Sequence, residues 1–146
     1  METTLNKIRE HSPCEGSWRK LLSGLSKTKA DDEPLKLITI LEILDIWDAV
    51  WCLRTLEYRD YCLFLADVVE PVLHVYEKLA ADQAPRNAIK AIDRWRNGEI
   101  SRIELQAAAY AAYDAADAAD ADAAAYAARR EQWQKTEQLF IKHFGS

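Results

Sequence analysis

The residues best suited to bind a ligand or do chemistry are aspartates and tyrosines within an alanine-rich segment, residues 107–128. Alanine has the highest helix propensity, so this segment is predicted to be helical. At about 100° per residue, five side chains share an arc of roughly 120°. They are Tyr110, Tyr113, Asp114, Asp117 and Asp120. We therefore take these five as the candidate partner-binding residues.

Three uses of this acidic face can be compared. Carboxylates on a straight helix diverge, so they do not form the cage of six to eight oxygens that calcium takes. A solvated charged face is the ordinary interpretation. The more specific one is a rigid surface whose carboxylates and tyrosines engage a basic groove on another protein, such as a groove that otherwise holds phosphates.

A second candidate is His74, which has Glu70 and Glu77 four residues before and three residues after it. This spacing could support a metal or an acid–base pair, but it is also ordinary helix surface. The sequence contains no phosphate-binding glycine loop, HExxH, GxSxG or CxxC. We therefore predict that the protein is not an enzyme and uses no metal or cofactor.

Composition limits the partner and the compartment. The net charge of −5 disfavours direct binding to nucleic acid, which needs a basic patch. Three cysteines without a CxxC pair are typical of reduced thiols in a cytoplasmic protein. The N-terminus lacks an apolar signal region, and charges interrupt the most apolar segment, residues 35–56. We expect a cytoplasmic protein that does not cross a membrane.

The elements that position the candidate residues are predicted to be helices. With only four glycines and four prolines in 146 residues, the sequence favours long helices over a turn-rich β fold. The predicted fold is all-α: one domain, residues 1–146, forming a bundle of about five to seven helices. Short helices occupy 1–30 and core helices 31–98.

Local signals predict several helix ends. Thr3 or Thr4 can cap a first helix, and Asn97-Gly98 is typical of a left-handed C-cap. Ser101 and Glu104 have the spacing of a capping box at the start of the alanine-rich helix. Pro71 should kink or split the helix that contains it.

The segment from Asp31 to Leu56 is apolar nearly all round and should be buried on most sides. We expect its helix to start at Asp31–Pro34, where acidic side chains and proline suit a first turn. We expect this segment to form either one central helix or two helices that meet near Asp45. Trp47 and Trp51 would lie on the same helix face.

The last predicted helix, residues 101–143, would be about 60 Å long if straight. That exceeds a domain with a radius of gyration of roughly 15 Å. It either bends near 120–122 and packs on its own chain, or it overhangs and forms a homodimer through this C-terminal helix. An overhang would expose four large side chains: Trp133, Leu139, Phe140 and Phe144.

The C-terminal part of the sequence, about residues 60–146, resembles the Imm5-like immunity proteins. The resemblance is carried by residues 85–91 (PRNAIKA), Trp95, residues 98–100 (GEI) and the alanine-rich helix with interspersed aromatics. Proteins of that family are small, α-helical and assigned to toxin–immunity systems. Family members often carry histidine where this chain has Tyr113, so a role that depends on imidazole would not transfer.

The N-terminal half is similar to small alanine-rich proteins of phage and prophage genomes. The similar segments are 7–14, Trp18, 27–34 and 51–54. Together, the two resemblances imply a protein that acts by binding another protein. The first hypothesis is an immunity-type inhibitor of a toxin or effector. The alternatives are an anti-CRISPR-like phage protein whose acidic helix occupies a host nuclease, and a helical scaffold protein.

Overall fold

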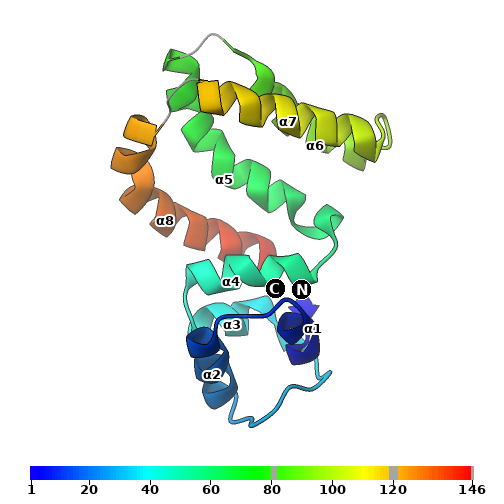
Figure 1. Cartoon of the computed structure of the whole chain (residues 1–146), viewed down its shortest axis with the longest axis vertical. Helices are drawn as coiled ribbons and strands as arrows, with labels where there is room; N and C mark the ends of the chain where they lie inside the picture. The colour runs from blue at the N-terminus through cyan, green and yellow to red at the C-terminus, as the bar shows by residue number, and fades with distance from the viewer. Residues whose placement is uncertain (80–81, 119–121, 146) are drawn as a thin grey trace. The chain divides into compact units, whose positions relative to one another are not determined.

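The computed structural model is all-α, as the composition predicts. It describes residues 1–79, 82–118 and 122–145, with the backbone alone at 72, 75, 78, 79, 116–118 and 122–131. The helices are α1 (Leu5–Glu10), α2 (Glu15–Gly24), α3 (Leu37–Ile43), α4 (Ile46–Cys52), α5 (Tyr58–Leu79), α6 (Ala84–Arg96), α7 (Arg102–Ala118) and α8 (Asp122–Phe144) (Figure 1). Leu53–Thr55 forms a 3-10 helix, and β1 (Glu2–Thr3) pairs antiparallel with β2 (Leu35–Lys36).

The chain divides into two compact units. The first contains Met1–Tyr61 and Thr136–Ser146, and the second contains Cys62–Lys135. Each unit buries its own apolar side chains. The buried residues of the first unit include Leu5, Ile8, Leu21, Leu37, Ile40 and Phe140, and those of the second include Phe64, Leu73, Ile92 and Leu105. Whether both units behave as one domain, as the chain length suggests, stays a prediction.

The predicted helix start at Asp31–Pro34 is wrong. The chain after Pro34 forms β2, whose residues pair with β1, and α3 begins only at Leu37. The Asp31 carboxylate accepts a hydrogen bond from Lys27 Nζ at 2.6 Å and another from the backbone of Glu33. Asp31 therefore stabilises a loop, while the backbone that follows it, in β2, pairs with β1 from the N-terminus.

The apolar segment that follows forms two helices that meet at Asp45, one of the two predicted arrangements. The Asp45 side chain accepts a hydrogen bond from the backbone N–H of Asp48, which is how an N-cap starts a helix. The expected burial is incomplete, because Trp47 is 60% exposed. Trp47 lies in the first turn of α4, whereas the buried positions of this helix are Ile46, Ala49 and Cys52.

The end of α8 packs against its own chain. Phe140 and Phe144 are 0% and 1% exposed, and their ring centroids lie 4.7 Å apart. Trp133 and Leu139 are half-buried. These four side chains are therefore not exposed in the way that an overhang would require, and a homodimer through the C-terminal helix stays a prediction. A bend was predicted near residues 120–122. Residues 120 and 121 lie outside the part of the chain that the structure describes.

In the second unit, α5 continues through Pro71 and is not split there. The turn between α6 and α7 confirms the expected C-cap. Gly98 has φ +76°, its N–H donates to the Trp95 carbonyl at 3.0 Å, and the N–H of Glu99 donates to the Arg94 carbonyl at 2.8 Å. These two bonds form a Schellman motif, which ends α6 and turns the chain back into the α6–α7 hairpin (Figure 1).

Replacing Gly98 by alanine tests this turn. A Cβ there would meet no atom within 4 Å, so its cost is the left-handed backbone alone. We expect Gly98→Ala to lower the free energy of unfolding by about 1–2 kcal/mol. The matched control is Gly16→Ala in α2, where a Cβ also meets no atom but the backbone is helical.

Gly16→Ala should raise the free energy of unfolding by about 0.5–1 kcal/mol, because alanine favours the helix. Both values are obtained from urea unfolding followed by circular dichroism. Equal and small effects at the two positions would show that the turn does not hold Gly98 at positive φ.

Candidate functional site

A reciprocal pair of hydrogen bonds starts α7, the helix that carries the candidate residues. The N–H of Ser101 donates to Glu104 Oε2 at 2.7 Å, and the N–H of Glu104 donates to Ser101 Oγ at 3.2 Å. This is the capping box that the sequence predicts. The hydrogen bonds from the Ser101 backbone and then its side chain lower the pKa of the Glu104 carboxyl. The helix dipole also stabilises a carboxylate in the first turn.

Three contacts fix how α7 is rotated about its axis. Leu105 and Ala115 are buried, at 5% and 9% exposure. The Tyr76 hydroxyl of α5 donates a buried hydrogen bond to the carbonyl of Ala115 at 3.0 Å. At the other end, the Arg102 guanidinium lies 5.4 Å from the centroid of the Trp95 ring of α6. The face of α7 that includes Leu105 and Ala115 is therefore turned inward.

The opposite face is open to solvent. Ile103, Tyr110 and Tyr113 are 77%, 71% and 72% exposed, and Asp114 is exposed beside them. We call these four residues the outer face of α7. The structure thus brings together three of the five candidate residues, together with Ile103, which the sequence analysis did not include. The side chain of Asp117 and all of Asp120 lie outside the described residues.

The unusual feature of the outer face is that its large side chains, Ile103, Tyr110 and Tyr113, are more than 70% exposed to solvent. Contiguous apolar surface on a soluble protein is often where a partner binds. Tyrosine is enriched among residues that dominate binding energy, because it combines apolar area with a hydroxyl. The face offers contact area and one described carboxylate, and its four residues include no nucleophile beside a base.

The second candidate, His74, lies in a polar cluster that joins α5 to α6. Its ring nitrogens are 3.9 Å from carboxylate oxygens of Glu70 and Glu77. Both glutamates are bound by Arg86 of α6: Nη1 donates to Glu70 at 3.1 Å, and Nη2 and Nε donate to Glu77. Arg86 was not among the candidate residues, because no local pattern in the sequence marks it as the partner of residues nine and sixteen positions away.

This arrangement explains the electrostatics of the cluster. Arg86 lowers the pKa of the Glu77 carboxyl, mainly through its hydrogen bonds and then through its charge. The two glutamates in turn raise the pKa of Arg86. Arg86 thus forms a bidentate ion pair with Glu77 that joins α5 to α6. Among the described residues, no group of three or more histidine, cysteine or acidic side chains is placed to hold a metal ion.

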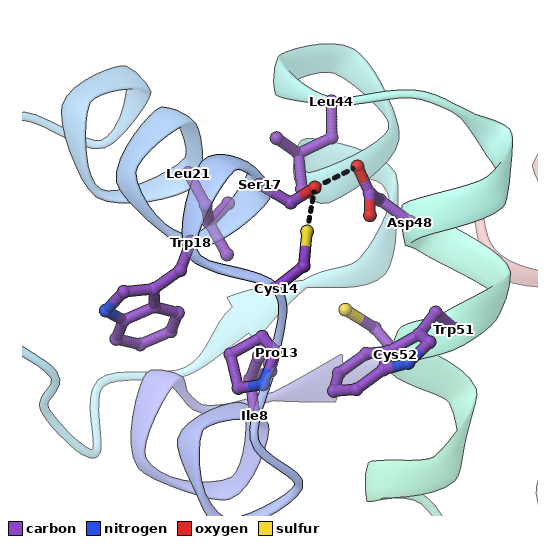
Figure 2. Close-up of a pocket in the computed structure, with 10 residues that line it drawn as sticks. All are labelled: Ile8, Pro13, Cys14, Ser17, Trp18, Leu21, Leu44, Asp48, Trp51 and Cys52. Carbon is purple, nitrogen blue, oxygen red and sulfur yellow. Dashed lines mark hydrogen bonds between the residues drawn. The ribbon is translucent and has the colours of Figure 1, made fainter.

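The first unit contains a pocket that the sequence analysis did not foresee. It lies between α1, α2 and α4 and has a volume of about 90 Å³. Figure 2 shows Ser17 between Cys14 and Asp48, with Trp18 and Trp51 among the lining side chains. The thiol of Cys14 donates to Ser17 Oγ at 3.0 Å, and the Ser17 hydroxyl donates to Asp48 Oδ2 at 2.9 Å.

One feature of the sequence points weakly to this pocket, the excess of tryptophan. The chain has five tryptophans, and two of them line one small pocket. The other information that defines the pocket comes from tertiary packing. Ser17 and Asp48 are 31 residues apart, and only the packing of α2 beside α4 brings them together.

Comparison with known proteins identifies one family whose model matches the chain. The family model described as Imm-5 like putative immunity protein matches residues 52–131. This is more than half of the 146 residues, and it contains all of α5, α6 and α7. The chain belongs to this family. No curated protein and no solved structure matches the chain.

The match confirms the resemblance, with different limits. It begins at 52 and ends at 131, whereas the resemblance covered about 60–146. The pocket residues before Cys52 therefore lie outside the matched segment. None of the helices in the described part of the chain combines the length and apolar character of a membrane span.

The Arg86 cluster predicts a pH-dependent effect on stability. The pKa of Glu77 is below its ordinary 4.5 in the folded protein, so its ionised form stabilises the fold. This stabilisation is fully present at pH values above the ordinary pKa of the unfolded chain. It is lost as the pH falls through the lowered pKa of the folded protein. Arg86→Gln should therefore reduce the free energy of unfolding more at pH 7 than at about pH 3.

The measurement is urea unfolding of both proteins at the two pH values. Arg94→Gln is the matched control, because its exposed guanidinium lies 3.5 Å from Glu99 and such pairs contribute little. A loss for Arg86→Gln that is the same at both pH values would show that Glu77 does not depend on Arg86.

Proposed function

We propose that the protein is a non-enzymatic inhibitor of immunity type, which neutralises a toxin or effector protein by direct contact through the outer face of α7. The observation that carries this proposal is the exposure of Ile103, Tyr110 and Tyr113 on one side of a helix whose other side is held. Family membership supports the immunity role, and the matched segment contains α7. The proposal assigns no cofactor and no catalytic step.

The physical argument starts from pre-organisation. The capping box and the Tyr76 hydrogen bond hold α7 before a partner arrives, so little conformational entropy remains to be lost on binding. Tyr110 and Tyr113 then act as anchors in apolar pockets of the partner. Such pairs of aromatic anchors contribute most of the binding free energy in many interfaces, while the surrounding contacts exclude water.

The charge of the region indicates the kind of partner. Residues 101–128 contain one arginine against five carboxylates, and the whole chain carries −5. We infer that the partner presents a basic surface, since opposite charge steers association and discriminates against wrong partners. A toxin that acts on nucleic acid has such a surface where it holds phosphates. The direct partner is therefore a protein, and the inhibitor itself does not bind nucleic acid.

The compartment is also part of the proposal. None of the three cysteines, all of which the structure describes, forms a disulfide, and two of them, Cys52 and Cys62, are buried. Burial and then the charge of Asp48 raise the pKa of the Cys52 thiol to about 12, which keeps it protonated and unreactive. Free thiols are typical of reducing compartments, so we place the protein in the cytoplasm.

A second candidate function uses the same helix. In a phage-type inhibitor of a host defence nuclease, the carboxylates would imitate phosphates and carry most of the affinity. The acidic composition of residues 101–128 favours this alternative. The two candidates differ in which side chains dominate: tyrosines for a toxin inhibitor that uses apolar anchors, and aspartates for phosphate imitation.

Two variants separate these candidates: Tyr110→Ala with Tyr113→Ala, and Asp114→Asn with Asp117→Asn and Asp120→Asn. The assay is rescue of cells that express a candidate toxin, with affinity measured by calorimetry. We expect the tyrosine variant to bind at least about thirtyfold more weakly, the effect of one strong anchor. The aspartate variant should mainly slow association and weaken its dependence on salt.

The matched control removes three charges elsewhere, with Glu42→Gln, Asp60→Asn and Asp93→Asn at exposed positions. Circular dichroism must show unchanged helix content in all variants. Loss of binding in the aspartate variant with full binding in the tyrosine variant would favour phosphate imitation. Full binding in both variants would exclude this face as the binding site.

A further inference from the structure

The pocket between α1, α2 and α4 has the composition of a binding site for a small charged group. Its described lining residues all belong to the first unit, and all of them except Cys52 lie before the segment that the family model matches. Its volume of about 90 Å³ is several times the space that one water needs. It is therefore independent of α7, and nothing in the proposed function uses it.

The polar atoms of the pocket converge on one carboxylate. Ser17 accepts a hydrogen bond from the Cys14 thiol and donates its own proton to Asp48 Oδ2, so its hydroxyl is already satisfied. Asp48 is half-buried and is the only acidic residue among the described residues that line the pocket. In the described residues no basic side chain lies within ion-pair distance of it. The hydrogen bond from Ser17 and the N-terminus of α4 stabilise this carboxylate in its ionised form, so it can act as the counter-ion of a cation in the pocket.

The walls beside Asp48 suit a cation. Trp18 and Trp51 line the pocket, with Pro13 between them in Figure 2. Tryptophan is the aromatic side chain that best attracts an ammonium or guanidinium group. The Trp51 ring already does so, because the guanidinium of Arg54 lies 4.0 Å from its centroid while Arg54 Nε donates to the Trp51 carbonyl.

Arg54 also sets a limit. It is exposed, is not one of the residues that line the pocket, and forms no ion pair with Asp48. Its charge nevertheless lies near Cys52, where it opposes the effect of Asp48. Arg54 therefore offsets part of the charge of Asp48 beside Cys52, which predicts weak binding of a single positive charge.

We propose that this pocket binds one organic cation, an ammonium or guanidinium group on a short apolar stem, with Asp48 as its counter-ion and Trp18 and Trp51 as its apolar walls. Such a group occurs in small amines and in the lysine or arginine side chains of another protein. The chemistry is the same in both cases, so the probes must separate them.

Cys14 provides the reporter for the test. It is exposed at the pocket, whereas Cys52 and Cys62 are buried, so neutral iodoacetamide should alkylate Cys14 alone in the folded protein. A cation in the pocket covers the Cys14 thiol and slows this reaction. Tryptophan fluorescence gives a second, independent signal, because the ligand lies against two indole rings.

The probes are n-butylammonium and n-propylguanidinium, with the neutral n-butanol and n-propylurea as matched controls. At concentrations on the order of 10 mM, each cation should slow alkylation by about twofold or more, as one cation–π contact and one ion pair allow. The neutral compounds should not. Acetyl-lysine amide and acetyl-arginine amide, tested in the same way, show whether the pocket also accepts these groups as protein side chains.

The variant that tests the assignment is Asp48→Asn, which keeps the acceptor for Ser17 but removes the charge. It should lose both the protection and the fluorescence change, while Glu42→Gln, an exposed charge outside the lining, keeps them. Equal protection by neutral compounds, an unchanged response in Asp48→Asn, or no response to either cation would each overturn the proposal. These results do not depend on α7, so the proposed immunity function can fail separately.

Discussion

The turn between α6 and α7 is the constraint on which the candidate surface depends. Gly98 ends α6 through a Schellman motif, and three residues later Ser101 and Glu104 begin α7 through a capping box. With so short a connection, α7 must return along α6, and Tyr76 then fixes its rotation. The side chains that remain outside follow from that geometry, because a helix turned inward at Leu105 and Ala115 must present its other side to solvent.

The sequence predicts those features of the fold that are settled within a few residues. Caps at Thr4, Gly98 and Ser101 are examples, because each depends on a side chain or a backbone angle beside the helix end. The all-α class follows equally from composition. The predicted helix start at Pro34 failed because a distant strand competes for the same backbone, and no local pattern contains that information.

The candidate sites show the same limit. Helical periodicity places Tyr110, Tyr113 and Asp114 on one side of the helix, because which residues share a side is a local property. That this side is the exposed one depends on how α7 packs. The Arg86 cluster and the tryptophan pocket depend on which helices pack together, and spacing along the chain does not determine that. Function adds a further step, because the proposed immunity role comes from the family, while the exposed helix contributes only a surface.

The most direct test of the central claim is hydroxyl-radical footprinting of the isolated protein, with oxidation located by mass spectrometry. If α7 is held as described, Tyr110 and Tyr113 are oxidised several times faster than the buried Tyr76, and Ile103 faster than Leu105. Comparable rates within each pair would mean that α7 is rotated differently or not held, and the outer face would then not exist as a pre-formed binding surface.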